Sequence, residues 1–484
     1  MTRQPNIVFI LADDMGWGDF SLFANVVPPA SPAPQPDTGR LPVSGDGSLQ
    51  TPALDALCGQ GTCLTQHYSA SAVCAPARAG LLTGRYPHRT GAIDTLEGRG
   101  LDRLALREVT LADRLRARGY ATGLVGKWHL GALDPRYHPN LRGFDEFVGF
   151  RGGWHDYWDW WLYYNDGIRK SDGRYLTDVF TDESVDFIRR HKHEPFFLHV
   201  TYNAPHFPFQ APEAEVRPFL ETGRYTTAVA TIYAMIQRMD AGVGRILEEL
   251  KKQGIEDNTL VIFTSDNGPQ LGGSGDESTM RYNCGYNGAK GTTYEGGIRI
   301  PLVARWPDGT EGENHFHEMV HFVDWLPTLL AVAGADPGDT SEGLPIDGQN
   351  VLPVLRGESG QVQTRRFWQW NRYTPLITGN AAMRDGAWKL VRPAIREAMQ
   401  LAPEDLEMDR GLKYRPEQYD DIRRGPDPAR DVPPPPPAQL FNIDDDPLEQ
   451  HDLAQAEPAR VEKMLAELET WFEAVEADRR SITD

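Results

Sequence analysis

The sequence predicts an α/β protein, with a large, doubly wound and mostly parallel sheet flanked by helices and a smaller C-terminal α+β domain. Four short apolar runs rich in Ile, Val and Phe have the character of buried strands, and they alternate with stretches of helical periodicity. This alternation is typical of a parallel sheet covered by helices on both faces. From about residue 366 the pattern changes to short aromatic and β-branched runs, which indicate a small antiparallel sheet. We therefore predict one domain over residues 1–365 and a second over residues 366–484.

The elements of the first domain follow from local signals. The buried strands are expected at residues 7–11, 121–125, 196–201 and 259–264, with another apolar strand ending at Ala304. Helices are expected from Pro52 and over residues 111–118, 178–191, 226–252 and 317–333. Thr51 suits a helix N-cap and Pro52 the first helical position, while Gly119 and Gly254 suit helix ends.

The remaining segments are connectors and the C-terminal elements. Residues 25–50 are rich in Pro, Gly and Ser and predict a surface loop. The proline run within residues 431–437 predicts a stiff connector. Residues 439–443 predict a further strand, and Pro458 begins a terminal helix that reaches Arg479.

Composition restricts the functions that this chain can have. The 484 residues are 40% hydrophobic and 24% charged, which is typical of a globular protein. The net charge of -20 argues against nucleic-acid binding through a general basic surface. An anionic substrate must therefore be attracted by a local basic pocket. No stretch is long enough to span a membrane, so we expect no membrane partner.

The cysteines and the N-terminus suggest a compartment. The chain has four cysteines, which are Cys58, Cys63, Cys74 and Cys284. If one of them serves chemistry, the odd remainder favours a reducing compartment, although a Cys58–Cys63 bridge is the alternative. The first apolar run is too short for a signal peptide. We therefore expect the protein in the cytoplasm.

Polar residues follow each of the four buried strands. Asp13 and Asp14, Lys127 and His129, His206, and Asp266 and Asn267 come just after these strands. In open α/β sheets ligands bind at the carboxyl ends of the strands, which makes this edge the candidate site. The oxygen ligands of the aspartates and Asn267 favour calcium or magnesium over zinc. Taken singly, each group also suits a solvated turn or a core histidine, and Lys290 suits plain solubility.

Cys74 lies in the segment from Ser71 to Arg85. Pro76 and Gly84 suit the two ends of a short helix, which places Cys74 where backbone N–H groups and the helix dipole favour an anion. Extended backbone around Trp128 would turn Lys127 and His129 to one side. A lowered thiol pKa is the expectation, and a buried structural cysteine is the alternative. A cysteine-based phosphatase is excluded, because it needs an arginine where Gly80 stands.

This segment resembles the signature of the type I sulfatases, which are arylsulfatase-like enzymes of the alkaline phosphatase superfamily. The matching residues are Cys74, Pro76, Arg78, Leu81, Thr83, Gly84 and Arg85, and Gly126 to Gly131 match a second family motif. The resemblance covers most of residues 5–335. Two features differ from many members, namely the longer 25–50 loop and the absence of a visible secretion signal.

The resemblance implies a cofactor and a modification. A formylglycine-generating enzyme would convert Cys74 into formylglycine, whose hydrated diol is the nucleophile. One divalent ion, usually calcium, would be held by Asp13, Asp14, Asp266 and Asn267 and would contact residue 74. Magnesium is the alternative ion.

The resemblance also implies roles for the basic residues. Arg78 and Lys127 would stabilise the negative charge, and His129 would take a proton from the sulfated diol and so expel sulfate. His206 and Lys290 would bind the sulfate and protonate the leaving alcohol. The implied activity is hydrolysis of aryl or carbohydrate sulfate monoesters.

Two alternative functions stay open. A phosphonate monoester or phosphodiester hydrolase has the same cysteine signature. An inactive relative that binds sulfated ligands would keep Cys74 unmodified. The sequence does not specify the oligomeric state, and a homo-oligomer is compatible with it.

The loop at residues 153–164 is the densest aromatic cluster of the chain. We interpret it as a wall of the substrate pocket, with Trp154 and His155 as candidate binding residues. A packed hydrophobic base is the alternative. Glu295 and Arg299 are expected to form a structural pair.

Overall fold

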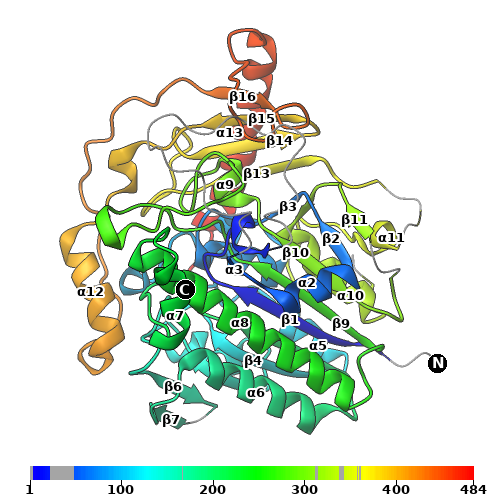
Figure 1. The fold of residues 1–484 in the computed structure, drawn as a ribbon. Coiled ribbons are helices and arrows are strands. Elements are labelled where there is room, and N and C mark those ends of the chain that lie inside the picture. The colour runs from blue at the N-terminus through cyan, green and yellow to red at the C-terminus, as the bar shows by residue number, and fades with distance from the viewer. Residues whose placement is uncertain are drawn as a thin grey trace.

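The computed structural model describes residues 4–21, 48–165, 167–310, 314–336, 343–356, 358 and 361–484 (Figure 1). Most of the predicted 25–50 loop therefore lies outside the described residues. Among the described residues, no helix has the length and apolar character needed to cross a bilayer.

A ten-stranded sheet forms the centre of the larger part. Its order is β11-β2-β10-β9-β1-β8-β4-β5-β6-β7. These strands are β1 (Asn6–Ala12), β2 (Thr62–Leu64), β4 (Ala121–Lys127), β5 (Glu146–Phe150), β6 (Trp161–Tyr164), β7 (Gly167–Lys170), β8 (Phe196–Thr201), β9 (Thr259–Ser265), β10 (Leu302–Arg305) and β11 (Asn314–Phe316). The five central strands from β9 to β5 are parallel, whereas β10 and the β6–β7 edge are antiparallel to their neighbours. The predicted fold class, including a mostly parallel sheet, is confirmed.

Helices cover both faces of this sheet, and the larger part has ten described α-helices in all. They are α2 (Pro52–Gly59), α3 (Cys74–Thr83), α4 (Pro87–Thr90), α5 (Leu111–Ala117), α6 (Leu176–His191), α7 (Glu213–Glu221), α8 (Thr227–Lys252), α9 (Glu295–Ile298), α10 (Trp325–Val332) and α11 (Leu352–Leu355). Val8 and Ile10 of β1 pack into the core beneath α6 and α8, which cross the near face in Figure 1. Ile7 and Phe9 point into the opposite core with α3 and α10. Because neighbouring side chains of a strand alternate between faces and both faces are buried, β1 is apolar from Ile7 to Ala12.

The predicted helix at residues 317–333 is wrong in its first half. Val320 and His321 form the short strand β12 (Val320–His321), which pairs with β3 (His67–Tyr68). A 3-10 turn follows, in which Asp324 accepts a hydrogen bond from the His321 backbone N–H at 2.8 Å. Only then does α10 begin. Pairing with a distant strand overrides the local helical pattern here.

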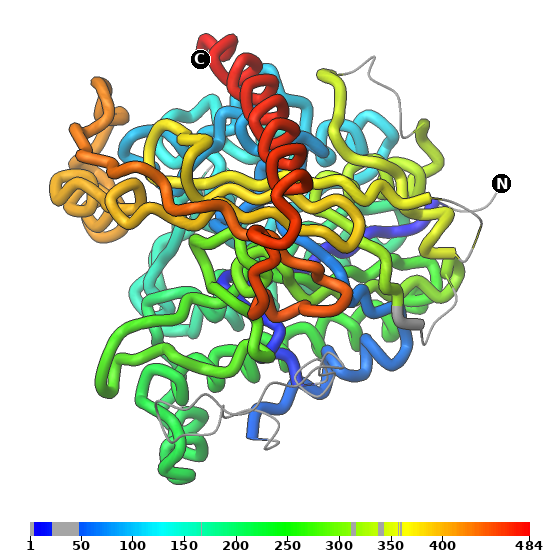
Figure 2. The backbone as a smooth tube through the Cα atoms, turned by 90° about the horizontal axis from the view of Figure 1, so that it is seen from above, coloured from blue at the N-terminus to red at the C-terminus, as the bar shows by residue number. Residues whose placement is uncertain are grey.

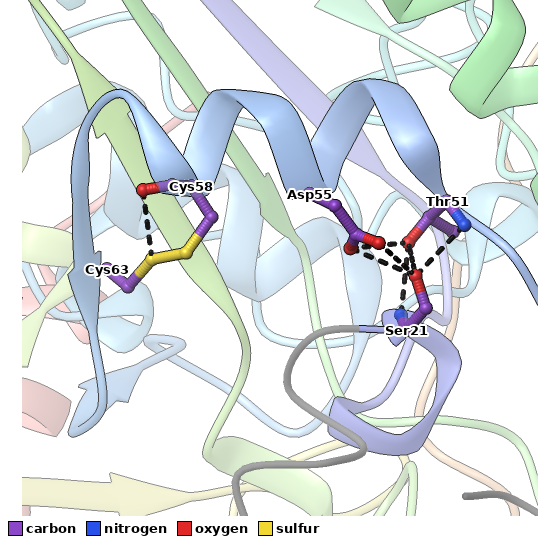
Figure 3. The surroundings of a disulfide bond; sticks show 5 residues. All are labelled: Ser21, Thr51, Asp55, Cys58 and Cys63. Atoms are coloured by element: carbon purple, nitrogen blue, oxygen red, sulfur yellow. Dashed lines mark hydrogen bonds between the residues drawn. A yellow bond between two sulfur atoms is a disulfide. The ribbon is translucent and has the colours of Figure 1, made fainter. Parts of the chain in front are cut away.

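The surroundings of α2 correct two further expectations (Figure 3). The Thr51 hydroxyl does not cap the helix and instead lies 2.6 Å from the Ser21 hydroxyl. Cys58 and Cys63 form a disulfide, with Cα atoms 5.8 Å apart, so the weaker of our two cysteine interpretations is the correct one. The turn from the end of α2 into β2 brings these two side chains together. Among the described cysteines, Cys74 and Cys284 are free and buried.

The C-terminal part has a four-stranded antiparallel sheet and a terminal helix. The strands are β13 (Arg365–Gln369), β14 (Ala381–Asp385), β15 (Trp388–Arg392) and β16 (Gln439–Asn442), and α13 (Pro458–Arg480) lies across one face of them (Figure 2). The other face packs against Tyr68, Ala72 and Ile298 of the larger part. The helix α12 (Pro403–Tyr414), between β15 and β16, has no counterpart in the sequence analysis.

Candidate active site

Four neighbouring strands deliver the candidate residues to one edge of the sheet. Strands β9, β1, β8 and β4 lie side by side and are parallel. Asp13 and Asp14 follow β1, Asp266 and Asn267 follow β9, and Lys127 ends β4. The loop after β8 contributes His206. Strand order therefore places these separate sequence segments next to one another.

Carboxylate and amide groups form the floor of this site. Asn267 donates from Nδ2 to Asp14 Oδ1 at 2.7 Å, and the Asp14 backbone N–H donates to Asp266 Oδ1 at 3.2 Å. Asp14 adopts a positive φ of 66°, a conformation that is uncommon for residues other than glycine. One candidate ligand atom from each of Asp13, Asp14, Cys74 and His206 lies within 4.8 Å of the others. Asn267 Oδ1 is buried without a hydrogen-bond partner among the described residues.

These donors fit a hard divalent cation. Asp13 and Asp14 belong to the cluster of candidate ligands, and Asp266 and Asn267 are hydrogen-bonded to Asp14. Carboxylate and amide oxygens are the ligands that calcium and magnesium prefer. The unpaired Asn267 oxygen is costly in a buried site unless something binds it. A cation would satisfy it.

Cys74 is the first residue of α3, and its Sγ lies 3.4 Å from Asp13 Oδ1. The helix ends as predicted, with Gly84 in the left-handed region at φ 66°. The predicted lowering of the thiol pKa is wrong. Burial raises the pKa of Cys74, and Asp13 and Asp266 add to that effect, against the opposing influence of Lys127 and Lys290. The unmodified thiol is therefore protonated and is a poor nucleophile.

The side chain of Arg78 extends back toward the N-terminal end of its own helix, α3. Its Nη2 lies 2.8 Å from Asp266 Oδ2, and its Nη1 donates to the backbone oxygen of Lys127 at 3.1 Å. Lys127 in turn places Nζ 2.6 Å from Asp13 Oδ2. Both cations are buried against the carboxylates of the floor, so they can neutralise further negative charge there.

Lys290 and His206 form the more open side of the site. Lys290 Nζ lies 2.7 Å from Asp14 Oδ2, and His206 Nε2 lies 3.7 Å from the same oxygen. The pKa of Lys290 is raised, because the lowering effect of burial is outweighed by Asp14, Cys74 and Asp13 together. The pKa of His206 is lowered to about 3 by burial and by Lys290. The histidine is thus neutral, and its Nδ1–H donates to the Phe207 carbonyl at 2.6 Å.

His129 borders the site from another direction. Strand β4 ends at Lys127 and His129 has φ 56°, so the expected extended alternation of the two side chains does not hold. His129 Nε2 donates to the Thr95 carbonyl at 3.3 Å and lies 3.9 Å from Glu97 Oε1. Nδ1 is buried without a hydrogen-bond partner among the described residues. Burial and Lys127 lower the pKa of His129, so the ring is neutral, and with Nε2–H donating to Thr95 the Nδ1 atom carries the lone pair.

The candidate wall residues differ in their placement. Trp154 packs between Phe207 and Tyr414. His155 is buried inside its own loop, where its Nδ1 accepts from the Asp156 backbone N–H at 2.9 Å and its Nε2 lies 3.4 Å from the Trp161 backbone nitrogen. Both ring nitrogens of His155 thus face backbone groups and not the carboxylate floor.

The sequence analysis did not identify two cationic residues that support the site. Lys413 of α12 forms a close ion pair with Glu97 beside His129. Arg281 lies 2.7 Å from Asp19 and donates to the Asp14 carbonyl at 3.1 Å. No local pattern identifies these residues, because each contacts the site only through a chain segment that is distant in sequence. The predicted pair of Glu295 and Arg299 is present at 3.3 Å and lies in the interface with the C-terminal sheet.

The fold and the site together define a class of protein. A carboxylate-rich strand edge, a helix that begins at a buried cysteine and a ring of cationic groups are typical of an ester hydrolase for tetrahedral oxyanions in the alkaline phosphatase superfamily. The family model described as "Sulfatase" matches residues 5–335, and one described as "N-sulphoglucosamine sulphohydrolase, C-terminal" matches residues 287–410. The chain therefore belongs to the sulfatase family as a type I sulfatase, an enzyme that hydrolyses sulfate esters.

Several relatives are similar over most of the chain. N-acetylgalactosamine-6-sulfatase of Homo sapiens is 35% identical over 423 residues, which are 76% of this chain and 72% of that protein. Steryl-sulfatase of Mus musculus is 30% identical over 448 residues, which are 74% of this chain and 66% of that protein.

Solved structures share the fold. Ps i-CgsB in complex with k-i-k-neocarrahexaose has a TM-score of 0.76 at 29% identity, covering 97% of this chain and 93% of that chain. The phosphonate monoester hydrolase of Agrobacterium radiobacter has a TM-score of 0.60 at 21% identity, covering 98% and 96%, which is a likeness of fold alone.

Proposed function

We propose that this sulfatase hydrolyses carbohydrate or aryl sulfate monoesters through a formylglycine made from Cys74. The observation that carries the proposal is the position of Cys74 Sγ, 3.4 Å from Asp13 Oδ1 within the carboxylate floor and beside Lys127. A buried protonated thiol has little nucleophilic use in this position, whereas a hydrated aldehyde supplies a hydroxyl there. A formylglycine-generating enzyme is the maturation partner that this modification requires.

Asp13, Asp14, Asp266 and Asn267 would hold one divalent cation, calcium in our proposal and magnesium as the alternative. The cation would supply positive charge for the nucleophile and for a sulfate oxygen. The unpaired Asn267 oxygen supports this assignment.

The chain's own side chains would carry the charge and the protons. Arg78 and Lys127 would stabilise the sulfate oxygens while one diol hydroxyl gives its proton to the neighbouring Asp13 carboxylate and attacks sulfur, and the ester S–O bond breaks. Lys290 is protonated before the reaction and would give a proton to the departing alkoxide, with His206 beside it. Nδ1 of His129 then takes the proton of the second hydroxyl. The C–O bond to sulfate breaks, which releases sulfate and restores the aldehyde.

Two relatives support a carbohydrate substrate for this chain. One is named for N-acetylgalactosamine-6-sulfatase activity, and another was solved with a neocarrahexaose. We place a sulfated saccharide first among the substrates and an aryl sulfate second.

The cytoplasmic location and a homo-oligomer remain predictions. The Cys58–Cys63 disulfide weighs against the location, because disulfides persist mainly in oxidising compartments. Cell fractionation and light scattering of the purified chain test the two predictions.

Mass spectrometry and a substrate panel test the proposal. The protein is produced together with a formylglycine-generating enzyme, and a mass deficit is expected on the peptide that contains Cys74. The matured protein should hydrolyse sulfated saccharides or aryl sulfates faster than aryl phosphonates or phosphodiesters. The reverse preference would establish the phosphonate hydrolase alternative. An unmodified cysteine without turnover would establish the inactive binding protein.

A further inference from the structure

Two exposed aromatic rings lie on one buried indole at the edge of the candidate site. Phe207 is 43% exposed and Tyr414 is 57% exposed, whereas Trp154 between them is 8% exposed. The Trp154 ring centroid lies 4.9 Å from that of Phe207 and 5.6 Å from that of Tyr414. We call Phe207, Trp154 and Tyr414 the aromatic rim. Single exposed apolar residues need no explanation, but a group assembled on a common base beside a site is a candidate binding surface.

The chain connects each ring of the aromatic rim to a residue of the site. Phe207 follows His206, and its carbonyl accepts the His206 Nδ1–H. Trp154 follows Gly153, where a Cβ atom would lie only 2.7 Å from the His129 ring. Tyr414 follows Lys413, whose ammonium pairs with Glu97 beside His129. The aromatic rim therefore borders the site between its two histidines.

Lys413 and Asp409 hold the indole in place. The Lys413 ammonium lies 5.8 Å from the Trp154 ring centroid, which is a cation–π distance, and the Trp154 Nε1–H donates to Asp409 Oδ2 at 3.4 Å. Both residues belong to α12. The C-terminal part thus contributes the anchor of the aromatic rim as well as one of its exposed rings.

The polar surroundings favour a sugar over a flat hydrocarbon ring. The phenol of Tyr414 interacts electrostatically with Asp156, Arg410 and Asp159. The Asp156 carboxylate accepts from the backbone N–H groups of Trp158 and Asp159. The Asp159 carboxylate is an acceptor that can bind hydroxyl groups. Aromatic faces that cover C–H surfaces, next to acceptors for hydroxyls, suit a pyranose.

We propose that Phe207 and Tyr414 bind the sugar ring that carries or adjoins the sulfate, and thereby select saccharide sulfates. This inference deepens the proposed function and rests on it for the position of the sulfate. The aromatic rim touches none of the reacting atoms, so it contributes to binding and specificity alone. Trp154 acts as a positioning residue for the two exposed rings.

A binding experiment that needs no turnover tests the aromatic rim. Cys74→Ser protein is titrated by calorimetry with a panel of sulfated galactose, N-acetylgalactosamine and glucosamine saccharides, and with inorganic sulfate. The tightest saccharide is then titrated against Phe207→Ala and Tyr414→Ala in the same background. Each change is expected to raise the Kd for the saccharide about three- to ten-fold and to leave that for sulfate unchanged. Ile168→Ala, which removes an apolar side chain that is 60% exposed on β7, is the matched control.

Three results would overturn the assignment of the aromatic rim. These are saccharide binding that is unchanged by both substitutions, an equal loss for saccharide and sulfate, and a panel in which no saccharide binds more tightly than sulfate. The matured wild-type enzyme is assayed in parallel. If the enzyme turns over but the substitutions do not change saccharide binding, only the proposed role of the aromatic rim is refuted. Weakened saccharide binding without any turnover refutes the hydrolytic proposal alone.

Discussion

Arg281 clamps Asp19 at the back of the candidate metal site. The Arg281 Nε lies 2.7 Å from Asp19 Oδ1 and its Nη2 lies 2.7 Å from Asp19 Oδ2, with both side chains buried. The same Nη2 donates to the backbone carbonyl of Asp14 at 3.1 Å. The clamp thus supports the backbone that holds Asp14 at its positive φ.

Loss of this clamp should weaken cation binding. Arg281→Lys keeps the charge but removes the bidentate geometry, so Asp14 loses its outer support. Changes of this kind cost about 10- to 100-fold in metal affinity. Calorimetric titration with calcium measures the change, and Arg245→Lys at an exposed ion pair is the control. An unchanged calcium affinity in folded Arg281→Lys protein would show that the clamp is purely structural.

Calcium should stabilise the folded chain, because the proposed ligands converge only in the native state. A ligand present at 100 times its Kd adds about 2.7 kcal/mol to the free energy of unfolding. We expect the Tm of the wild-type protein to rise with calcium and to fall with a chelator. The Tm of Asn267→Ala should change with neither. The control is Asn258→Ala at an exposed amide that bonds Gln4. A calcium response retained by Asn267→Ala would exclude Asn267 from the ligand set.

Lys290→Met should discriminate between leaving groups. Lys290 is protonated and lies on the open side of the site, so it is placed to protonate a departing alkoxide. We expect turnover of a saccharide sulfate to fall about 10²- to 10⁴-fold. The loss for 4-nitrophenyl sulfate should be much smaller, because nitrophenolate leaves without a proton. Equal losses in kcat for both substrates would assign Lys290 to sulfate binding alone.

Glu449 should make stability depend on pH. Lys389 lies 2.8 Å from both Glu449 and Glu295, so one buried ammonium serves two carboxylates. Burial raises the pKa of Glu449 to about 7, and Glu295 adds to the rise against the opposing effect of Lys389. The folded state therefore keeps a proton that the unfolded state releases above about pH 4.5.

The proton on Glu449 stabilises the folded state at low pH. The stabilisation is complete below about pH 4.5 and is lost as the pH rises to about 7, with a total on the order of 3 kcal/mol. Glu449→Gln should flatten the unfolding free energy in this window, as measured by denaturant titration at several pH values. The exposed Glu473→Gln is the comparison. A variant that keeps the wild-type slope would contradict the prediction.

The supports of the site lie beyond local sequence patterns. Lys413 reaches Glu97 from a helix of the C-terminal part, and Arg281 reaches Asp19 across more than half of the chain. Long charged side chains give the same local signal on a solvated surface. Their function as clamps depends on which groups the fold buries beside them.

Interactions between residues that are close in the chain determined the buried strands and the helix ends of this protein. Continuous apolar runs such as residues 7–11 are buried on both faces, and the polar residues that follow them mark the ligand edge of the sheet. Pro76 lies in the first turn of the helix that begins at Cys74 and Gly84 ends it, since the backbone preferences of these two residues act within a few positions.

Only the tertiary structure decided the order β9-β1-β8-β4, the antiparallel β10 and the Cys58–Cys63 bond. It also reversed the expected direction of the pKa shift of the Cys74 thiol. Desolvation and the neighbouring carboxylates disfavour the thiolate more than the start of the helix was expected to stabilise it. Strand order and burial depend on contacts between residues far apart in the chain, whereas propensities and caps depend on neighbours. The sequence therefore specified the parts of the site, and the packing of distant segments set their distances and charges.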